Sequence, residues 1–173
     1  MFKKMSFMQG ERGLAMQDDD LLDAGFEAFP RGLGFADTIA PLFIKSEKTA
    51  IVLALKVEQK HLNGINICHG GVLMLLADIC CAWNVRAQLP EAVASPTLAL
   101  SFDFMSAAKQ GDWLETRLEL LEVKRKVGFA GGTIVCGRKN CVRFNGTFYI
   151  PEAGSFKIRQ DIAEQYRVKR DPE

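Results

Sequence analysis

With 173 residues, 48% of them apolar and 25% charged, the chain has the size and composition of one globular domain, which excludes a disordered or fibrous protein. Lys plus Arg (22) and Asp plus Glu (21) nearly cancel, so no global field would attract nucleic acid or an acidic membrane surface. The five cysteines form no C-x-x-C pair, which argues against a zinc or redox site and favours reduced thiols in a cytoplasmic protein.

Residues 1–30 are predicted to form an N-terminal extension. The start, MFKKMSFMQG, is followed by ERGLAMQDDD instead of a long apolar core, so it does not have the pattern of a secretory signal. Acidic capping residues and apolar spacing in DDDLLDAGFEAF, residues 18–29, predict a short helix that ends at Pro30.

Residues 31–152 are predicted to form the single domain, beginning with strands. Two strand-like runs lie between Gly34 and Leu62. The second, AIVLALKVEQ, places Ile51, Leu53, Leu55 and Val57 in alternation with residues that become polar towards its end. This alternation predicts a strand that is half-buried at its far end.

The next segment, residues 63–83, reads NGINICHGGVLMLLADICCAW and predicts one long buried helix that begins at His-Gly-Gly. Its apolar run is interrupted by Asp78 and is shorter than the ~20 residues that a bilayer span needs. We therefore expect the core helix of a soluble protein and no membrane partner.

Four strands are predicted after this helix, starting at Thr97, at Trp113 and at about residues 129 and 142. One face of the first strand is expected to carry Leu98, Leu100, Phe102 and Phe104, and the other Thr97, Ser101 and Asp103. The short connections AAKQGD, KRKVG and RKN predict that consecutive strands are antiparallel neighbours. Residues 153–173 have apolar residues at helical spacing and are predicted to be a tail, helical or frayed.

This order of elements predicts an α+β fold in which a curved antiparallel sheet wraps one long helix. A helix that is apolar on all sides needs such a sheet, or other chains that cover what the sheet leaves open.

Asp78 is the residue of this helix that most needs an explanation. No Lys or Arg lies three or four residues away to pair with it, so it does not belong to a solvated stripe of charges. An unpaired buried carboxylate costs several kcal/mol, which favours a general base or a nucleophile. A structural Asp bonded to a neighbouring group is the alternative.

The His69-Gly70-Gly71 step indicates an oxyanion site at the start of the helix. Helix N-termini expose unpaired N–H groups, so the Gly70 amide could face a developing negative charge, although His69 could also be a simple helix cap. Gly70 and Asp78 are eight residues apart, about 12 Å along a helix. One carbonyl group cannot touch both in one chain, so a working pair requires an antiparallel second copy and a twofold dimer with two equivalent sites.

The combination Asn63, His69-Gly70-Gly71 and Asp78, followed by a strand that starts at Thr97 with the sequence TLALSFDFMSAAKQGD, resembles the hotdog-fold acyl-CoA thioesterases. The resemblance spans about residues 34–150 and is strongest to the phenylacetate-pathway-like branch of the 4-hydroxybenzoyl-CoA thioesterase superfamily. Ala107 stands where the family usually has Pro, and Cys68 where it often has an aliphatic residue.

The resemblance implies hydrolysis of an aryl- or medium-chain acyl-CoA in a homodimer, often a tetramer, with no metal or organic cofactor. It implies that Asp78 is the base or nucleophile and that the Gly70 N–H polarises the thioester carbonyl. Asn63 and His69 would orient the water and the thioester, and Thr97 would place a hydroxyl near the carboxylate. Cations on two predicted turns could bind the coenzyme A phosphates: Lys124, Arg125, Lys126, Arg138 and the adjacent Lys139.

Three other interpretations stay open at this point. Cys68 could be a nucleophile with His69 as its base, although adjacent side chains on an extended segment point apart. A hydratase or dehydratase on the same fold would be expected to have a Pro-Gly step before the helix, which this sequence lacks. A non-catalytic acyl-binding dimer would bury Asp78 without using it.

Overall fold

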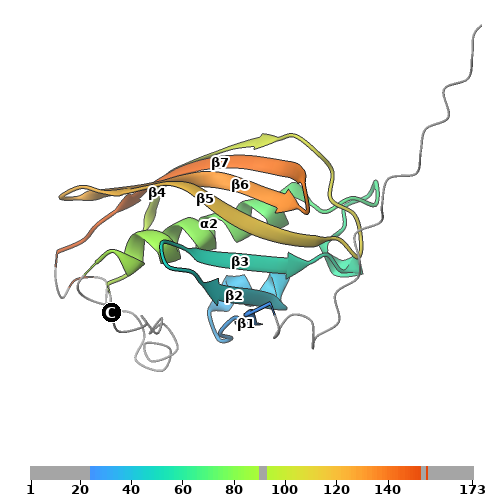
Figure 1. The fold of residues 1–173 in the computed structure, drawn as a ribbon, viewed down its shortest axis with the longest axis horizontal. Helices are drawn as coiled ribbons and strands as arrows, with labels where there is room; N and C mark the ends of the chain where they lie inside the picture. Colours follow the sequence, from blue (N-terminus) through green and yellow to red (C-terminus); the bar gives the residue numbers. More distant parts are fainter. Residues whose placement is uncertain (1–23, 90–92, 153–154, 156–173) are drawn as a thin grey trace, which may run out of the picture.

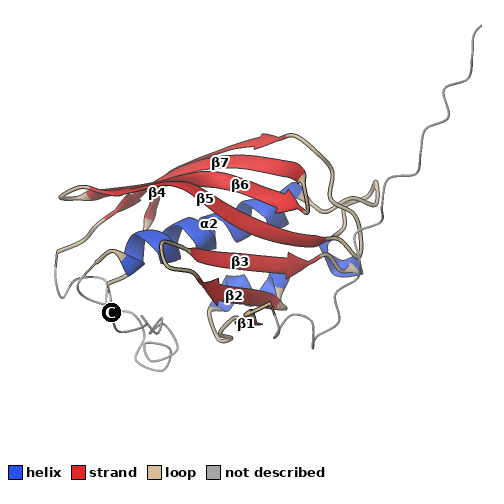
Figure 2. Ribbon diagram, in the orientation of Figure 1, coloured by secondary structure: helices blue, strands red, loops and turns tan. Residues whose placement is uncertain are grey.

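The computed structural model describes residues 24–89, 93–152 and 155. In it, a seven-stranded antiparallel sheet curves around one long helix (Figures 1 and 2), which confirms the predicted α+β hotdog arrangement. The elements in chain order are β1 (Glu27–Ala28), the 3-10 helix η1 (Gly34–Ile39), β2 (Leu42–Ser46), β3 (Ile51–Lys56), the 3-10 helix η2 (Gln59–His61), α2 (Gly70–Ala87), β4 (Thr97–Phe104), β5 (Trp113–Val123), β6 (Val127–Cys136) and β7 (Lys139–Tyr149). The strand order is β1-β2-β3-β5-β6-β7-β4.

Helix α2 begins at Gly70, as the sequence predicts, and packs on the concave face of the sheet. Its buried side includes Leu73, Leu76 and Cys80. The helix and the sheet approach each other closely near the C-terminal end of α2, where a Cβ on Gly128 of β6 would lie 2.5 Å from Val85 Cγ1. By length and hydropathy alone α2 would also pass as a membrane span, but half of its residues are buried in this domain, which is typical of a core helix.

Strand β3 is buried on both faces up to Leu55, while Lys56 at its end is half-buried, which agrees with the prediction of a strand half-buried at its far end. Its second face, with Val52 and Ala54, is covered by Phe26 in a second, smaller core. Phe26 stands beside β1, which pairs with β2. The described part of the predicted N-terminal helix, residues 24–29, is therefore a turn and an edge strand. The rest of that helix and the predicted C-terminal tail lie outside the described residues, except for residue 155.

The prediction that β4 and β5 are neighbours is wrong. β4 pairs with β7, and β5 lies between β3 and β6. Three strand spacings separate β4 from β5, about 14 Å, and the eight connecting residues, 105–112, can span about 26 Å. A connection of this length could form either a hairpin loop or a crossing. Since β4 pairs with β7, residues 105–112 form a crossing segment.

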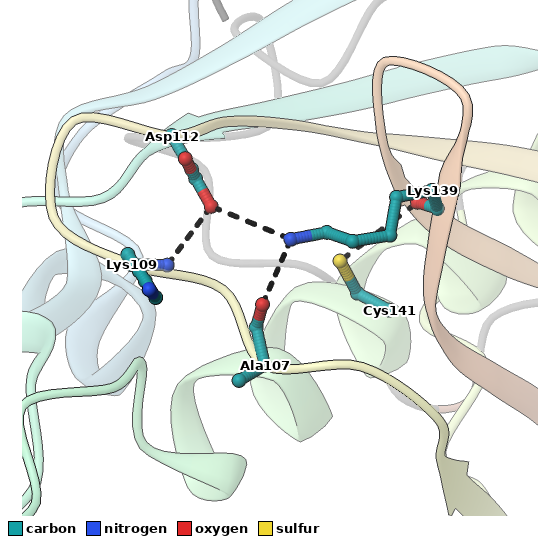
Figure 3. A network of polar contacts seen from close by, with 5 residues as sticks. All are labelled: Ala107, Lys109, Asp112, Lys139 and Cys141. Carbon is teal, nitrogen blue, oxygen red and sulfur yellow. Dashed lines mark hydrogen bonds and ion pairs between the residues drawn. The ribbon is translucent and has the colours of Figure 1, made fainter. Parts of the chain in front are cut away.

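The crossing segment is tied to its surroundings by a polar network (Figure 3). Lys139 Nζ donates to the Ala107 carbonyl at 2.9 Å and lies 3.9 Å from Asp112 Oδ2, which accepts the Lys109 N–H at 2.9 Å. The Cys68 N–H donates to the Ala108 carbonyl at 2.8 Å. These contacts hold the segment next to the start of α2.

Candidate active site

The start of α2 offers backbone donors, as the sequence predicts. His69 is the N-cap, and its Nδ1 accepts the Gly71 N–H at 2.9 Å. The His69 carbonyl accepts the Val72 N–H. Gly70 occupies the first helical position, where an N–H has no intrahelical acceptor. The Gly70 amide is therefore the donor of this turn that a ligand can use.

Asn63 stabilises the loop that leads to this turn. Its Oδ1 accepts the N–H groups of Ile65 and Ile67, at 3.0 and 3.3 Å. The loop closes through the His69 N–H, which donates to the His61 carbonyl at 2.8 Å. Because the oxygen of Asn63 is used within the loop, its NH2 group is the part that can reach a substrate or a water molecule.

Asp78 is half-buried and accepts a hydrogen bond from the hydroxyl of Thr97. The distance from Thr97 Oγ1 to Asp78 Oδ1 is 2.7 Å. Thr97 was predicted on the face of β4 opposite Phe102 and Phe104. The structure differs because the register shifts at Leu98, so that Thr97 pairs with Phe148 while Phe102 pairs with Phe144. This β-bulge turns Thr97 towards the helix.

We expect Thr97→Val to lower kcat about tenfold to a hundredfold, because a hydrogen bond to a charged group is worth about 1.5–3 kcal/mol. Thr97→Ser keeps the hydroxyl and should retain most of the activity. Steady-state rates of the two variants on the same thioester would test this. Equal rates for the Val and Ser variants would show that the hydroxyl has no part in the reaction.

One side of α2 is not covered by the sheet, and Asp78 lies on it. Residues at helical spacing on this side are exposed or half-buried: Gly71, Met74, Asp78 and Ala82. Apolar side chains of β4 and the residue after it are exposed as well, namely Leu98 (59%), Phe104 (54%) and Met105 (49%). Apart from Asp78, the open side of α2 is therefore apolar, and the Thr97 hydroxyl lies next to this carboxylate.

The cysteines do not support nucleophilic catalysis by a thiol. All five are free, as predicted. Burial raises the pKa of Cys68 and of Cys80 to about 11, so both thiols are protonated at neutral pH. His69 Nδ1 is engaged with Gly71. Within the described ranges, no group of three or more His, Cys, Asp or Glu side chains could hold a metal ion.

The predicted coenzyme A cations lie at opposite ends of the sheet. Residues 124–126 connect β5 to β6, whereas Arg138 connects β6 to β7, and the ten residues of β6 span about 33 Å between them. One coenzyme A cannot contact both turns of one chain. Lys124 pairs with Glu122, and Lys126 lies 3.5 Å from Glu152. Arg125 and Arg138 are exposed and have no such partner in the described part of the chain.

Two residues at the site were missed by sequence analysis. A Cβ on Gly70 would lie 3.2 Å from the Phe104 ring, so this ring covers the start of α2. His61, one of only two histidines in the chain, is buried beneath the loop. The sequence shows that His61 lies eight residues before His69. It does not show that the two residues are in contact, because this contact depends on how the loop between them closes.

Comparisons with known proteins find similarity to thioesterases and esterases. The thioesterase superfamily model matches residues 65–142. A candidate esterase of Pseudomonas aeruginosa, PA0474, is 27% identical over 128 residues, which are 73% of this chain and 96% of that protein. A shorter match, to a candidate esterase of Archaeoglobus fulgidus, is 31% identical over 93 residues and covers 45% of this chain and 58% of that protein.

Solved structures show the same fold. The Escherichia coli PaaI protein from the phenylacetic acid degradation operon is 27% identical, with a TM-score of 0.58 over 64% of this chain and 79% of that one. A hypothetical thioesterase protein from Streptococcus pneumoniae, solved with coenzyme A, is 21% identical, with a TM-score of 0.60 over 66% of this chain and 89% of that one. The sheet around a single helix shows a hotdog fold, and the match at residues 65–142 shows that this part of the chain is similar to the thioesterase superfamily.

Proposed function

We propose that this protein is an acyl-CoA thioesterase that hydrolyses an aryl- or medium-chain acyl-CoA to the free acid and coenzyme A. The observation that carries the proposal is the carboxylate of Asp78 on the open, apolar side of α2, held by the Thr97 hydroxyl at 2.7 Å. The match of the thioesterase superfamily model to residues 65–142 supports it. The coenzyme A in the Streptococcus pneumoniae structure supports this thioester class.

In this reaction Asp78 is either a general base, which takes a proton from the water molecule that attacks the thioester carbon, or a nucleophile, which attacks that carbon itself. The Gly70 N–H stabilises the negative charge that develops on the carbonyl oxygen as the new C–O bond forms. Asn63 and His69 orient the water and the thioester. The C–S bond then breaks, and the coenzyme A thiolate leaves; in the general-base route it takes up the proton that Asp78 removed from water. In the nucleophile route the acyl group stays on Asp78 as a mixed anhydride, which a water molecule hydrolyses to the free acid. No step requires a metal or an organic cofactor.

The proposal needs a homodimer, because Gly70 and Asp78 of one chain lie about 12 Å apart along α2. If the helices of two chains run antiparallel with Asp78 opposite the partner's Gly70, position 74 lies halfway and faces its own copy. Met74 is 42% exposed on the open side of α2, which suits such a contact. The free edge of β4 and the exposed Leu98 and Phe104 offer further surface to the second copy. A tetramer would need a further interface.

For the coenzyme A phosphates, Arg125 and Arg138 are the candidates that remain available. Arg138 lies at the end of the sheet near Gly70, since Phe104 pairs with Val142 there and also covers Gly70. Arg125 lies at the other end. In the proposed antiparallel dimer, the Arg138 end of one chain lies beside the Arg125 end of the other. Each site would therefore take Arg138 from one chain and Arg125 from its partner.

The test is a panel of acyl-CoAs of graded chain length and ring content, with release of free thiol measured by a thiol reagent. We expect thiol release with apolar acyl groups, because the exposed Met74 on the open side of α2 and the Phe104 ring next to Gly70 are both apolar. A hydratase on this fold would instead act only on an enoyl-CoA without thiol release. An acyl-binding dimer would bind the compounds and release nothing.

A further inference from the structure

We propose that His61 is a positioning residue that sets the start of α2 and, through it, the Gly70 N–H of the active site. This inference rests on the proposed function only for its kinetic readout. Its structural basis is a chain of two contacts, one from the His61 side chain and one from the His61 backbone.

The first contact is made by the ring. His61 is 1% exposed, and its Nδ1 accepts the Glu58 N–H at 2.9 Å. The Glu58 side chain in turn accepts the His61 N–H, so the two residues form a reciprocal capping box around η2. Because Nδ1 accepts, the neutral ring must carry its proton on Nε2. The ring therefore holds the backbone of η2 in one conformation.

The second contact passes from η2 to the helix. The His61 carbonyl accepts the His69 N–H at 2.8 Å, and Leu62 and Cys68 form the adjacent β-bridge. His69 is the N-cap of α2, and the next residue is Gly70. A shift of the His61 backbone would therefore move the N-cap and the amide beside it, with no contact between the His61 ring and the substrate.

The surroundings keep the ring in the neutral state that this role requires. Burial, helped by the ammonium group of Lys60, lowers the pKa of His61 below its ordinary value, and the Glu58 carboxylate opposes this only in part. Among the described residues no hydrogen-bond partner of Nε2 meets the distance and angle criteria, and the Ile39 backbone, the smallest of these influences, raises the pKa. A doubly protonated ring would lose the acceptor for the Glu58 N–H. Such a buried, incompletely satisfied group is costly to retain without a use.

The experiment compares three substitutions at this position. The oxygen of His61→Asn can take the place of Nδ1, whereas His61→Gln carries its oxygen further out and His61→Leu has none. We expect His61→Asn to keep most of the wild-type kcat. We expect the Gln and Leu variants to lose about tenfold to a hundredfold in kcat with KM unchanged, as for a catalytic donor that is slightly misplaced.

The matched control is Thr116→Val. Thr116 is also 1% exposed, and its hydroxyl accepts one backbone N–H, that of Leu53, at 2.9 Å. It lies on β5, away from the loop, so this variant should lose stability and keep its kcat. Equal kcat losses per degree of lowered Tm in His61→Leu and Thr116→Val would overturn the proposal, as would full activity of His61→Gln. If His61→Leu does not fold, the comparison of Asn with Gln decides.

A second measurement is independent of the enzymatic activity. The amide NMR signals of Gly70 and Gly71 should move in His61→Gln and stay near their wild-type positions in His61→Asn and Thr116→Val. If no acyl-CoA is hydrolysed by the wild type, the proposed function fails and this measurement still tests the positioning role. Unmoved Gly70 signals in His61→Gln would refute that role alone.

Discussion

Asp78→Asn is expected to lower thioester hydrolysis by about 10²–10⁴-fold while the protein stays folded. The Asn side chain has nearly the same shape, and its oxygen can still accept the Thr97 hydroxyl, which lies 2.7 Å from Asp78 Oδ1. What is lost is the ability to take a proton from water or to attack the thioester carbon, and a positioned base contributes a factor of this size. The measurement is kcat for thiol release, with Tm and the oligomeric state determined on the same samples.

Asp103→Asn is the matched control for this change. Asp103 is a carboxylate on β4, like Asp78 in charge, but its side chain is 60% exposed and lies 2.7 Å from Arg143 of β7. Exposed ion pairs contribute little to stability, so this variant should hydrolyse thioesters like the wild type. If Asp78→Asn also keeps its turnover, Asp78 is a structural residue, and the acyl-binding alternative is favoured.

The sequence predicts the helix and most strands because their signals are local. The His-Gly-Gly step marks the start of α2, which runs from Gly70 to Ala87. The alternation after Trp113 marks β5, which covers Trp113–Val123. Asp78 is recognisable because it is a single charge in an apolar helix, a contrast that needs no knowledge of the fold. For the same reason the candidate site can be assigned from the sequence to the helix and to its first turn.

The parts that the sequence does not reveal depend on contacts between distant residues. The bulge at Leu98 is invisible in the pattern because Leu98 itself fits the apolar alternation, yet it decides that Thr97 faces Asp78. The pairing of β4 with β7 depends on where the crossing segment 105–112 docks. The burial of Val52 and Ala54 depends on Phe26, more than twenty residues earlier. Neither alternation nor turn length carries this information.

Gly70→Pro is expected to lower kcat by about 10²–10³-fold, the usual loss for one oxyanion donor. Proline removes the N–H, and the first position of a helix tolerates it. His69 has φ −64° and ψ 134°, an extended conformation that suits the residue before proline. The added ring atoms meet the Phe104 side chain, which is 54% exposed and has room to turn away. Rates on one acyl-CoA and the Tm would test this, and an unchanged kcat would exclude the Gly70 N–H as the donor.

The two inactive variants together test whether the site is shared between chains. A heterodimer of one Asp78→Asn chain and one Gly70→Pro chain has both lesions in one shared site and none in the other. We expect it to recover about half of the wild-type activity, because a twofold dimer has two equivalent sites. Co-expression with two different affinity tags would isolate it, and each homodimer, carried through the same purification, is the control. If Asp78 and Gly70 of one chain act together, every site of the heterodimer carries a lesion and it stays as inactive as its parents.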